Sequence, residues 1–298
     1  VSELETLLGV DSRQELLEAR ARRSGFRQSG VSKNNRLLDR HETRIGPENK
    51  GFYWRSYDFM QNIGRGDLQQ FPLGPQFPGN VFQEVAFQED GGEMIFTLPN
   101  GLQGYYLANG DGDMLGTGPI QVVQDKNQVS GTPEIVCAQS CIYCHDAGIL
   151  TFSDSIRDTT STKGDAFQQV KRLFAEPQEM AGLIAADQKI FEIALRKAVG
   201  DFMVIGENLD DVVEPIGKVA LRYHGPSSDL SIEDVAVELY VDREKVEALG
   251  SVPAVADRVG LGLFRENGLI KRESWEASYR NVAWELYGIE PIVPGKSQ

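Results

Sequence analysis

Histidine, cysteine and basic residues are all scarce in this sequence. Its 298 residues include 3 His and 3 Cys, and 30 Lys and Arg against 44 Asp and Glu give a formal net charge of −14. Three cysteines cannot cross-link a chain of this size into a disulfide scaffold, and an odd number leaves at least one thiol unpaired. The acidic balance argues against binding to the phosphate backbone of nucleic acids. No apolar run approaches the roughly 18 residues of a transmembrane helix, so no membrane span is expected.

The composition is that of a folded protein, with 41% hydrophobic and 25% charged residues. At roughly 150 residues per domain, the length suggests two domains or one large one. The first residues show neither a basic n-region nor an apolar h-region, so we expect any export signal to be absent or already removed.

Strand signals lie in the middle of the chain and helix signals follow them. Segments 93–98 and 103–107 flank the turn signature Pro99-Asn100-Gly101, and 120–123 is predicted as a third strand. Helical spacing of apolar residues predicts helices over 1–25, 165–174, 177–199, 231–240, 243–249 and 271–287. The sequence therefore predicts an α+β fold, with a small antiparallel sheet and irregular loops in the front half and a mostly helical C-terminal half. We expect an N-terminal helix plus β-containing region at 1–136, packed on a helical domain at 137–298.

All three cysteines and one histidine lie within nine residues, at the start of the helical half. Residues 141–145, Cys-Ile-Tyr-Cys-His, form a complete C-x-x-C-H, the attachment signature of c-type haem. Two thiols at this spacing can add across the two haem vinyl groups, and the adjacent imidazole then binds the iron as its proximal ligand. The motif predicts one covalent haem c on Cys141 and Cys144, with His145 on the iron.

Two other interpretations use the same atoms. Cys137, Cys141 and Cys144 form C-x-x-x-C-x-x-C, which resembles the loop that holds a [4Fe–4S] cluster in radical S-adenosylmethionine enzymes. The residues after His145 lack the alternation of strands and helices that follows this loop in such enzymes. A structural zinc site would need adjacent Cys144 and His145 to share one tetrahedral ion, which is sterically difficult. Haem attachment is the prediction, and the iron–sulfur cluster remains an alternative.

Several stretches resemble a family of bacterial c-type cytochrome domains common in planctomycetes and their relatives, whose biochemical role is poorly defined. The resemblance is carried by GVSKNNR (30–36), RHETR (40–44), YWRSYDF (53–59), PLGP (72–75), GGEMIF (91–96), LPNGLQGY (98–105) and the C-x-x-C-H. It covers most of the chain from about residue 25 onward and weakens in the C-terminal helices. The resemblance implies a monohaem domain, and Cys137 has no counterpart in its pattern.

Electron-carrying haems usually have two axial protein ligands, whereas catalytic haems usually leave one coordination position open. The candidates for the second ligand are His41, His224 and the five methionines Met60, Met94, Met114, Met180 and Met203, of which Met180 and Met203 are preferred. His41 lies in a segment that the resemblance includes, and Arg40 and Arg44 beside it suit pairing with haem propionates. The two methionines follow the motif by tens of residues, as the ligand does in small cytochromes.

The predicted function is electron transfer by a monohaem c-type cytochrome. Covalent haem attachment takes place outside the cytoplasmic membrane, so we expect a periplasmic or cell-surface location. The alternatives are a peroxidase-like haem oxidoreductase and a haem-based ligand sensor, both of which need an exchangeable sixth position. Whether the chain is an enzyme stays open, with electron transfer favoured. The acidic surface favours a redox partner protein with a basic docking surface, and no nucleic acid partner is expected.

Overall fold

The computed structural model describes residues 1–44, 50–199, 214–225, 229–262, 264 and 268–288. It divides into two compact units, Val1–Ala220 (unit 1) and Leu221–Gln298 (unit 2). A small antiparallel sheet in the N-terminal half and helices in the C-terminal half confirm the predicted α+β fold.

Residues on both sides of the predicted boundary at 136/137 belong to unit 1. Backbone hydrogen bonds connect the residues next to this position to an earlier segment of unit 1. The two-residue strands β6 (Thr117–Gly118) and β7 (Ile135–Val136) pair with each other, and the Cys137 amide donates to the Gly116 carbonyl at 2.9 Å. The segment that leads into the cysteine motif is thereby tied to the sheet-containing part of the chain.

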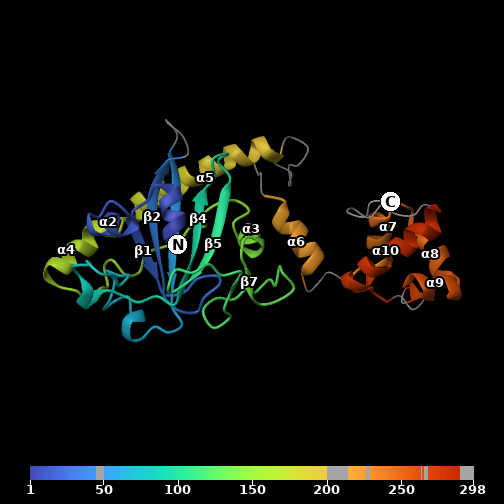
Figure 1. Ribbon diagram of the computed structural model, residues 1–298, viewed down its shortest axis with the longest axis horizontal. Helices are drawn as coiled ribbons and strands as arrows, with labels where there is room; N and C mark the ends of the chain where they lie inside the picture. The colour runs from blue at the N-terminus through green and yellow to red at the C-terminus, as the bar shows by residue number, and fades with distance from the viewer. Residues whose placement is uncertain (45–49, 200–213, 226–228, 263, 265–267, 289–298) are drawn as a thin grey trace. The chain divides into compact units, whose positions relative to one another are not determined.

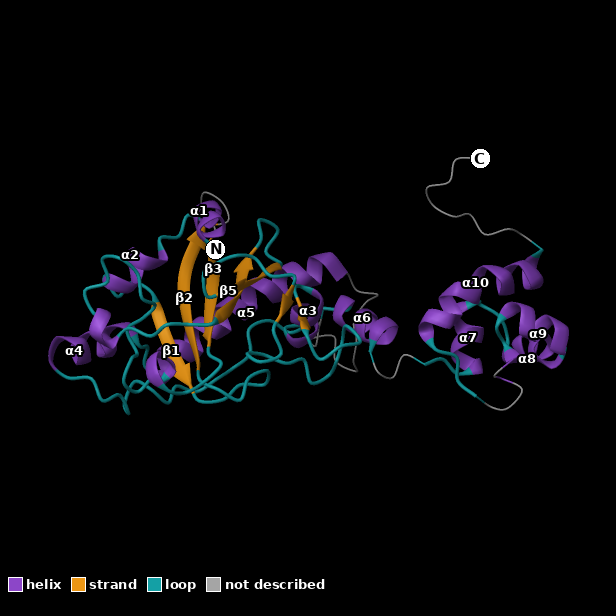
Figure 2. Cartoon of the chain, turned by 60° about the horizontal axis from the view of Figure 1, so that its bottom comes forward, coloured by secondary structure: helices purple, strands orange, loops and turns teal. Residues whose placement is uncertain are grey.

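Unit 1 is built on a five-stranded sheet in which each strand pairs antiparallel with the next, in the order β1-β2-β3-β4-β5 (Figures 1 and 2). The strands are β1 (Arg22–Phe26), β2 (Arg36–Arg44), β3 (Lys50–Asp58), β4 (Gly91–Thr97) and β5 (Gln103–Asn109). The predicted hairpin of segments 93–98 and 103–107 is confirmed as β4 and β5, and Gly101 takes the positive φ of 86° that its turn requires. The predicted strand at 120–123 is wrong, because the amides of Val122 and Val123 turn back to the Pro119 carbonyl.

The single helix predicted over 1–25 is wrong in extent. The structure has two short helices, α1 (Ser2–Leu8) and α2 (Ser12–Leu17), followed by strand β1. Gly9 ends α1 with a φ of 67°, and the Asp11 carboxylate begins α2 by accepting a hydrogen bond from the Gln14 amide. Residues 22–26 then form strand β1, because they pair with β2.

Side chains alternate between the two faces of the sheet, and each face packs against different helices. The helices concerned are α2, α4 (Gly164–Leu173) and α5 (Pro177–Val199). On one face, Leu37 and Tyr57 join a core with Leu16 of α2 and Leu173 of α4. On the other, Trp54 packs with residues of α5, which crosses this face of the sheet (Figure 1). We call the second face the pocket face; it presents Leu38, Arg40, Trp54, Ser56, Glu93, Ile95 and Tyr105.

A buried carboxylate fastens α5 to the pocket face. Asp187 is fully buried and accepts hydrogen bonds from Arg40 Nη2 at 2.8 Å, Arg40 Nε at 3.2 Å and Trp54 Nε1 at 2.8 Å. A buried carboxylate needs such partners to offset its lost hydration. The arrangement fixes the rotamer of the Trp54 indole.

The remaining helices are α3 (Gln139–Cys144), α6 (Ile216–His224), α7 (Ile232–Glu238), α8 (Arg243–Ser251), α9 (Pro253–Val259) and α10 (Arg272–Tyr287). Five predicted helices are confirmed as α4, α5, α7, α8 and α10. Ser231 and Asp234 form a reciprocal capping box at the start of α7. In unit 2, the helices surround an apolar core that contains the buried Trp275. Among the described residues, no helix has the length and apolar character needed to cross a membrane.

Candidate functional site

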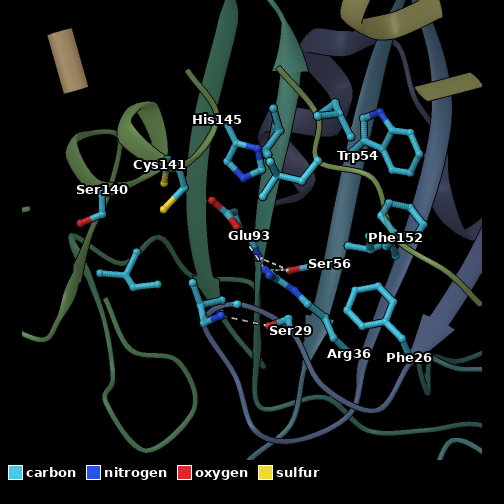
Figure 3. A pocket seen from close by; sticks show the side chains of 18 of the residues that line it. Phe26, Ser29, Arg36, Trp54, Ser56, Glu93, Ser140, Cys141, His145 and Phe152 are labelled. Carbon is cyan, nitrogen blue, oxygen red and sulfur yellow. Dashed lines mark hydrogen bonds and ion pairs between the residues drawn. The ribbon is translucent and has the colours of Figure 1, made fainter. Parts of the chain in front are cut away.

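The cysteine motif forms a short helix and its C-terminal cap. Cys141 and Cys144 lie three residues apart in α3, on one side of the helix, and His145 follows as the capping residue. Cys141 is buried, and Cys144 and His145 are half-buried. All three side chains line one cavity, so the structure brings the predicted attachment residues together (Figure 3).

Hydrogen bonds anchor the start of α3. The Ser140 hydroxyl donates to the buried Asp125 carboxylate at 3.2 Å and accepts from the Val136 amide at 3.1 Å. Asp125 in turn accepts from backbone amides of its own loop, including that of Val129 at 3.0 Å. The start of α6 lies directly on α3, since a Cβ at Gly217 would come within 2.5 Å of Tyr143 Cα. The position of the two thiols is therefore set by contacts outside the motif.

The ring orientation of His145 is fixed by one backbone carbonyl. His145 Nδ1 lies 3.1 Å from the Gly148 carbonyl oxygen. A carbonyl can only accept, so Nδ1 is the donor, and in the neutral imidazole the lone pair then lies on Nε2. Metal-binding histidines are commonly oriented in this way, with one nitrogen held by the protein and the other free for the metal. Gly148 can turn its carbonyl toward the ring because its φ is 101°, a conformation that other residues rarely adopt.

The cavity has a volume of about 570 Å³ and lies between α3 and the pocket face of the sheet. This is within the range of roughly 300–1,000 Å³ found for small-molecule sites. Across from the motif, Phe26, Trp54 and Phe152 form an aromatic wall (Figure 3). The ring centroids of Phe26 and Phe152 are 5.5 Å apart, and those of Trp54 and Phe152 are 5.9 Å apart in an edge-to-face arrangement. Other apolar side chains of the lining are Leu38, Ile95, Ile135, Ile149 and Leu150.

The loop that follows the motif carries Phe152 into this wall. It is held at both ends by hydrogen bonds to other elements. Gln188 of α5 donates to the Ile149 carbonyl at 2.8 Å, and the Asp154 carboxylate accepts from the Gly25 amide of β1 at 2.7 Å. The loop therefore spans from α3 to β1 and closes one side of the cavity.

An ion-paired network crosses the cavity between the motif and the aromatic wall. Arg36 Nη2 lies 3.1 Å from Glu93 Oε2 and 3.0 Å from the Ser56 hydroxyl, and Arg36 Nε lies 2.9 Å from Asp58 Oδ1. The Glu93 carboxylate points toward His145 (Figure 3). A carboxylate thus lies next to the imidazole and the thiols, and it is held in place by one arginine.

In this network the Glu93 carboxylate and the two motif thiols have different protonation states at neutral pH. Burial alone would raise the pKa of Glu93, but the charges of His145 and Arg36 and a hydrogen bond with Cys141 hold that pKa below its ordinary value. Burial and the adjacent Glu93 charge raise the pKa of Cys141 well above its ordinary value, and burial raises the pKa of Cys144 to about 11. At neutral pH Glu93 is ionised and both thiols are protonated. All three cysteines are free of disulfides.

Cys137 lies apart from the cavity. Its Sγ is 3.9 Å from the Tyr105 carbonyl oxygen, and its side chain packs in a cluster with Leu107 and Ile135. Within the described ranges, no group of three or more His, Cys, Asp or Glu side chains converges to hold a metal ion. The structure therefore does not assemble the three thiols of the [4Fe–4S] alternative, nor the four ligands of the zinc interpretation.

None of the predicted second ligands and propionate partners that the structure describes in unit 1 lines the cavity. His41 is buried on the opposite face of the sheet, with Nδ1 2.7 Å from Glu15 Oε2. Arg40 is bound to Asp187, and Arg44 is exposed at the end of β2. The other candidates are Met180, which is buried in the core between α5 and the sheet; His224, which is exposed at the end of α6; and Met203, which lies outside the described residues.

Arg36, Glu93 and Phe152 are site residues that sequence reasoning did not identify. Arg36 and Glu93 come from strands β2 and β4, which meet at the same cavity. Strand alternation is the signal that could have found them, because it places 36 and 38, 54 and 56, and 93 and 95 on one face. Comparisons with family models, curated proteins and solved structures found no match.

Proposed function

We propose that this chain is a c-type haem protein whose iron carries single electrons. The observation that supports this most directly is that both motif thiols and the free Nε2 of His145 line one cavity of about 570 Å³. Cys141 and Cys144 would hold the haem through thioether bonds, and His145 would bind the iron. The aromatic wall supplies apolar ring surface against which a porphyrin could pack. The residues present therefore fit a covalent haem c.

A bound haem supplies reversible one-electron oxidation and reduction. The chain sets the conditions for it: α3 fixes the attachment points, Gly148 orients the imidazole, and the paired Arg36 and Glu93 fix the charge beside it. The acidic net charge of −14 would steer a redox partner with a basic surface toward the protein. We place this function in the periplasm or at the cell surface, where covalent haem attachment takes place.

The test is expression of the chain with an export signal in a bacterium that attaches haem c. We expect haem to stay bound to the protein on a denaturing gel and to give the alkaline pyridine spectrum of thioether-linked haem. Reduced-minus-oxidised spectra then measure whether the iron cycles reversibly. Purified protein with labile iron and sulfide, and without haem absorbance, would contradict the proposal.

Replacing Glu93 with glutamine is expected to raise the midpoint potential of the haem. The change removes a negative charge beside the iron ligand, and this charge favours the more positive, oxidised iron. Charges at such short range in a protein give a shift on the order of tens of millivolts. Redox potentiometry followed by haem absorbance measures the shift.

Glu89→Gln is the matched control for this change. Glu89 is also a shielded carboxylate paired with an arginine, 3.5 Å from Arg55 Nη2, but it lies on the opposite face of the sheet. We expect its replacement to move the potential much less. Equal shifts in the two variants would show that Glu93 has no special relation to the haem.

A further inference from the structure

The wall of the cavity that faces the motif contains no strong iron ligand among the described residues. It consists of Phe26, Trp54 and Phe152 together with aliphatic side chains. His145 is the only histidine in the described lining, and no methionine belongs to it. Apart from His145, the described lining therefore offers a bound haem neither histidine nor methionine.

The remaining described histidines and methionines are engaged or located elsewhere. His41 and Met94 are buried on the opposite face of the sheet, where His41 pairs with Glu15. Met180 of α5 is buried in a cluster with Trp54 and does not line the cavity. Met60 and Met114 are exposed and do not line it either. Moving a buried ligand into the cavity would require breaking a packed cluster.

The charges of the cavity discriminate among ligands that could enter it. Arg36 is the guanidinium of the lining, and it is already paired with Asp58 and Glu93. Lys126 lies in an exposed loop at the rim. An anion would thus enter a largely apolar chamber next to the Glu93 carboxylate, where the Arg36 guanidinium is already paired. Uncharged ligands do not incur this penalty.

We propose that the haem-loaded protein keeps an exchangeable coordination position that binds small uncharged diatomic ligands, in a chamber formed by Phe26, Trp54 and Phe152. This inference rests on the proposed haem attachment. Trp54 gives the chamber a rigid wall, since its indole is held by the buried Asp187. The loop that carries Phe152 is tied to α5 and to β1, so the chamber has a fixed size.

Carbon monoxide added to the reduced holoprotein tests the proposal. We expect carbon monoxide to cause a saturable shift of the Soret band of the reduced protein. We expect azide to bind the oxidised protein at least tenfold more weakly than carbon monoxide binds the reduced protein. A six-coordinate, low-spin spectrum that ignores carbon monoxide would overturn the inference, and a gain of binding in Met180→Leu or Met203→Leu would then identify the residue that fills the position. Failure of the haem proposal itself looks different, because the protein would then contain no covalent haem to titrate.

A pair of phenylalanine variants tests the chamber. Phe152 and Phe96 are both half-buried, but Phe152 lines the cavity whereas Phe96 lies on the opposite face of the sheet. We expect Phe152→Ala to bind butyl isocyanide, a bulky uncharged ligand, about tenfold more tightly relative to carbon monoxide, since one methylene-sized gain in room is worth roughly 1–3 kcal/mol. Phe96→Ala should leave this ratio unchanged. An unchanged ratio in Phe152→Ala would show that these aromatic side chains do not bound the ligand.

Discussion

Replacing Cys141 and Cys144 together with serine is expected to abolish covalent haem attachment. Both thiols line the cavity, and serine hydroxyls do not add to vinyl groups under the conditions of haem attachment. We expect the double variant to lose all haem on a denaturing gel, while any haem that remains in the folded protein is extracted by acidified organic solvent. The measurement is haem retained per mole of protein after denaturation.

Replacing only Cys141 or only Cys144 with serine tests each of the two attachment points separately. With one thioether left, one vinyl group stays conjugated with the porphyrin, so the alkaline pyridine spectrum should shift to longer wavelength. Cys137→Ser is the control, because that thiol lies outside the cavity and packs with Leu107 and Ile135. It should retain the full haem content. Loss of haem in Cys137→Ser, with both motif thiols intact, would contradict the assignment.

Local signals in the sequence predicted the elements that depend on neighbours in the chain. The hairpin of β4 and β5 follows from its turn, and α5 from its apolar spacing. Strand β3 escaped prediction because Phe52, Tyr53 and Trp54 are all buried, which removes the alternation of a half-exposed strand. Strand β1 escaped because it follows two short helices and becomes a strand only by pairing with β2, which begins ten residues after it ends.

In the candidate site, too, only the residues that are neighbours in the sequence could be predicted. The motif is contiguous, so its three residues could be predicted. The opposite wall combines residues of β1, β3 and the loop after the motif, which are far apart in the sequence. Arg40 and His41 show most directly where prediction from the sequence failed. Both were predicted to serve one haem, but neighbouring residues of a strand point to opposite faces. Arg40 consequently reaches Asp187 on the pocket face, and His41 reaches Glu15 on the other.

The second large effect is expected from Arg23, which forms a completely buried ion pair. Arg23 Nε and Nη2 donate to the two oxygens of Asp39 at 2.6 and 2.7 Å, and Nη1 donates to the Pro72 carbonyl at 2.8 Å. Neither side chain of the pair has any exposed surface, and the guanidinium lies among the rings of Tyr57, Phe87 and Phe174. Water therefore cannot replace a lost partner.

Replacing Arg23 with methionine should lower the free energy of unfolding of unit 1 by about 3–5 kcal/mol, because Asp39 is left as an uncompensated buried charge. Arg22→Met is the matched control on the same strand: Arg22 is 33% exposed and pairs with the exposed Glu179, so its loss should cost at most about 1 kcal/mol. Urea unfolding of the holoprotein, followed by haem absorbance, measures both. The double variant Arg23→Met/Asp39→Leu should recover most of the loss, since it removes both charges together. If the double variant is as unstable as Arg23→Met, the defect lies in packing against the three rings rather than in the unpaired carboxylate.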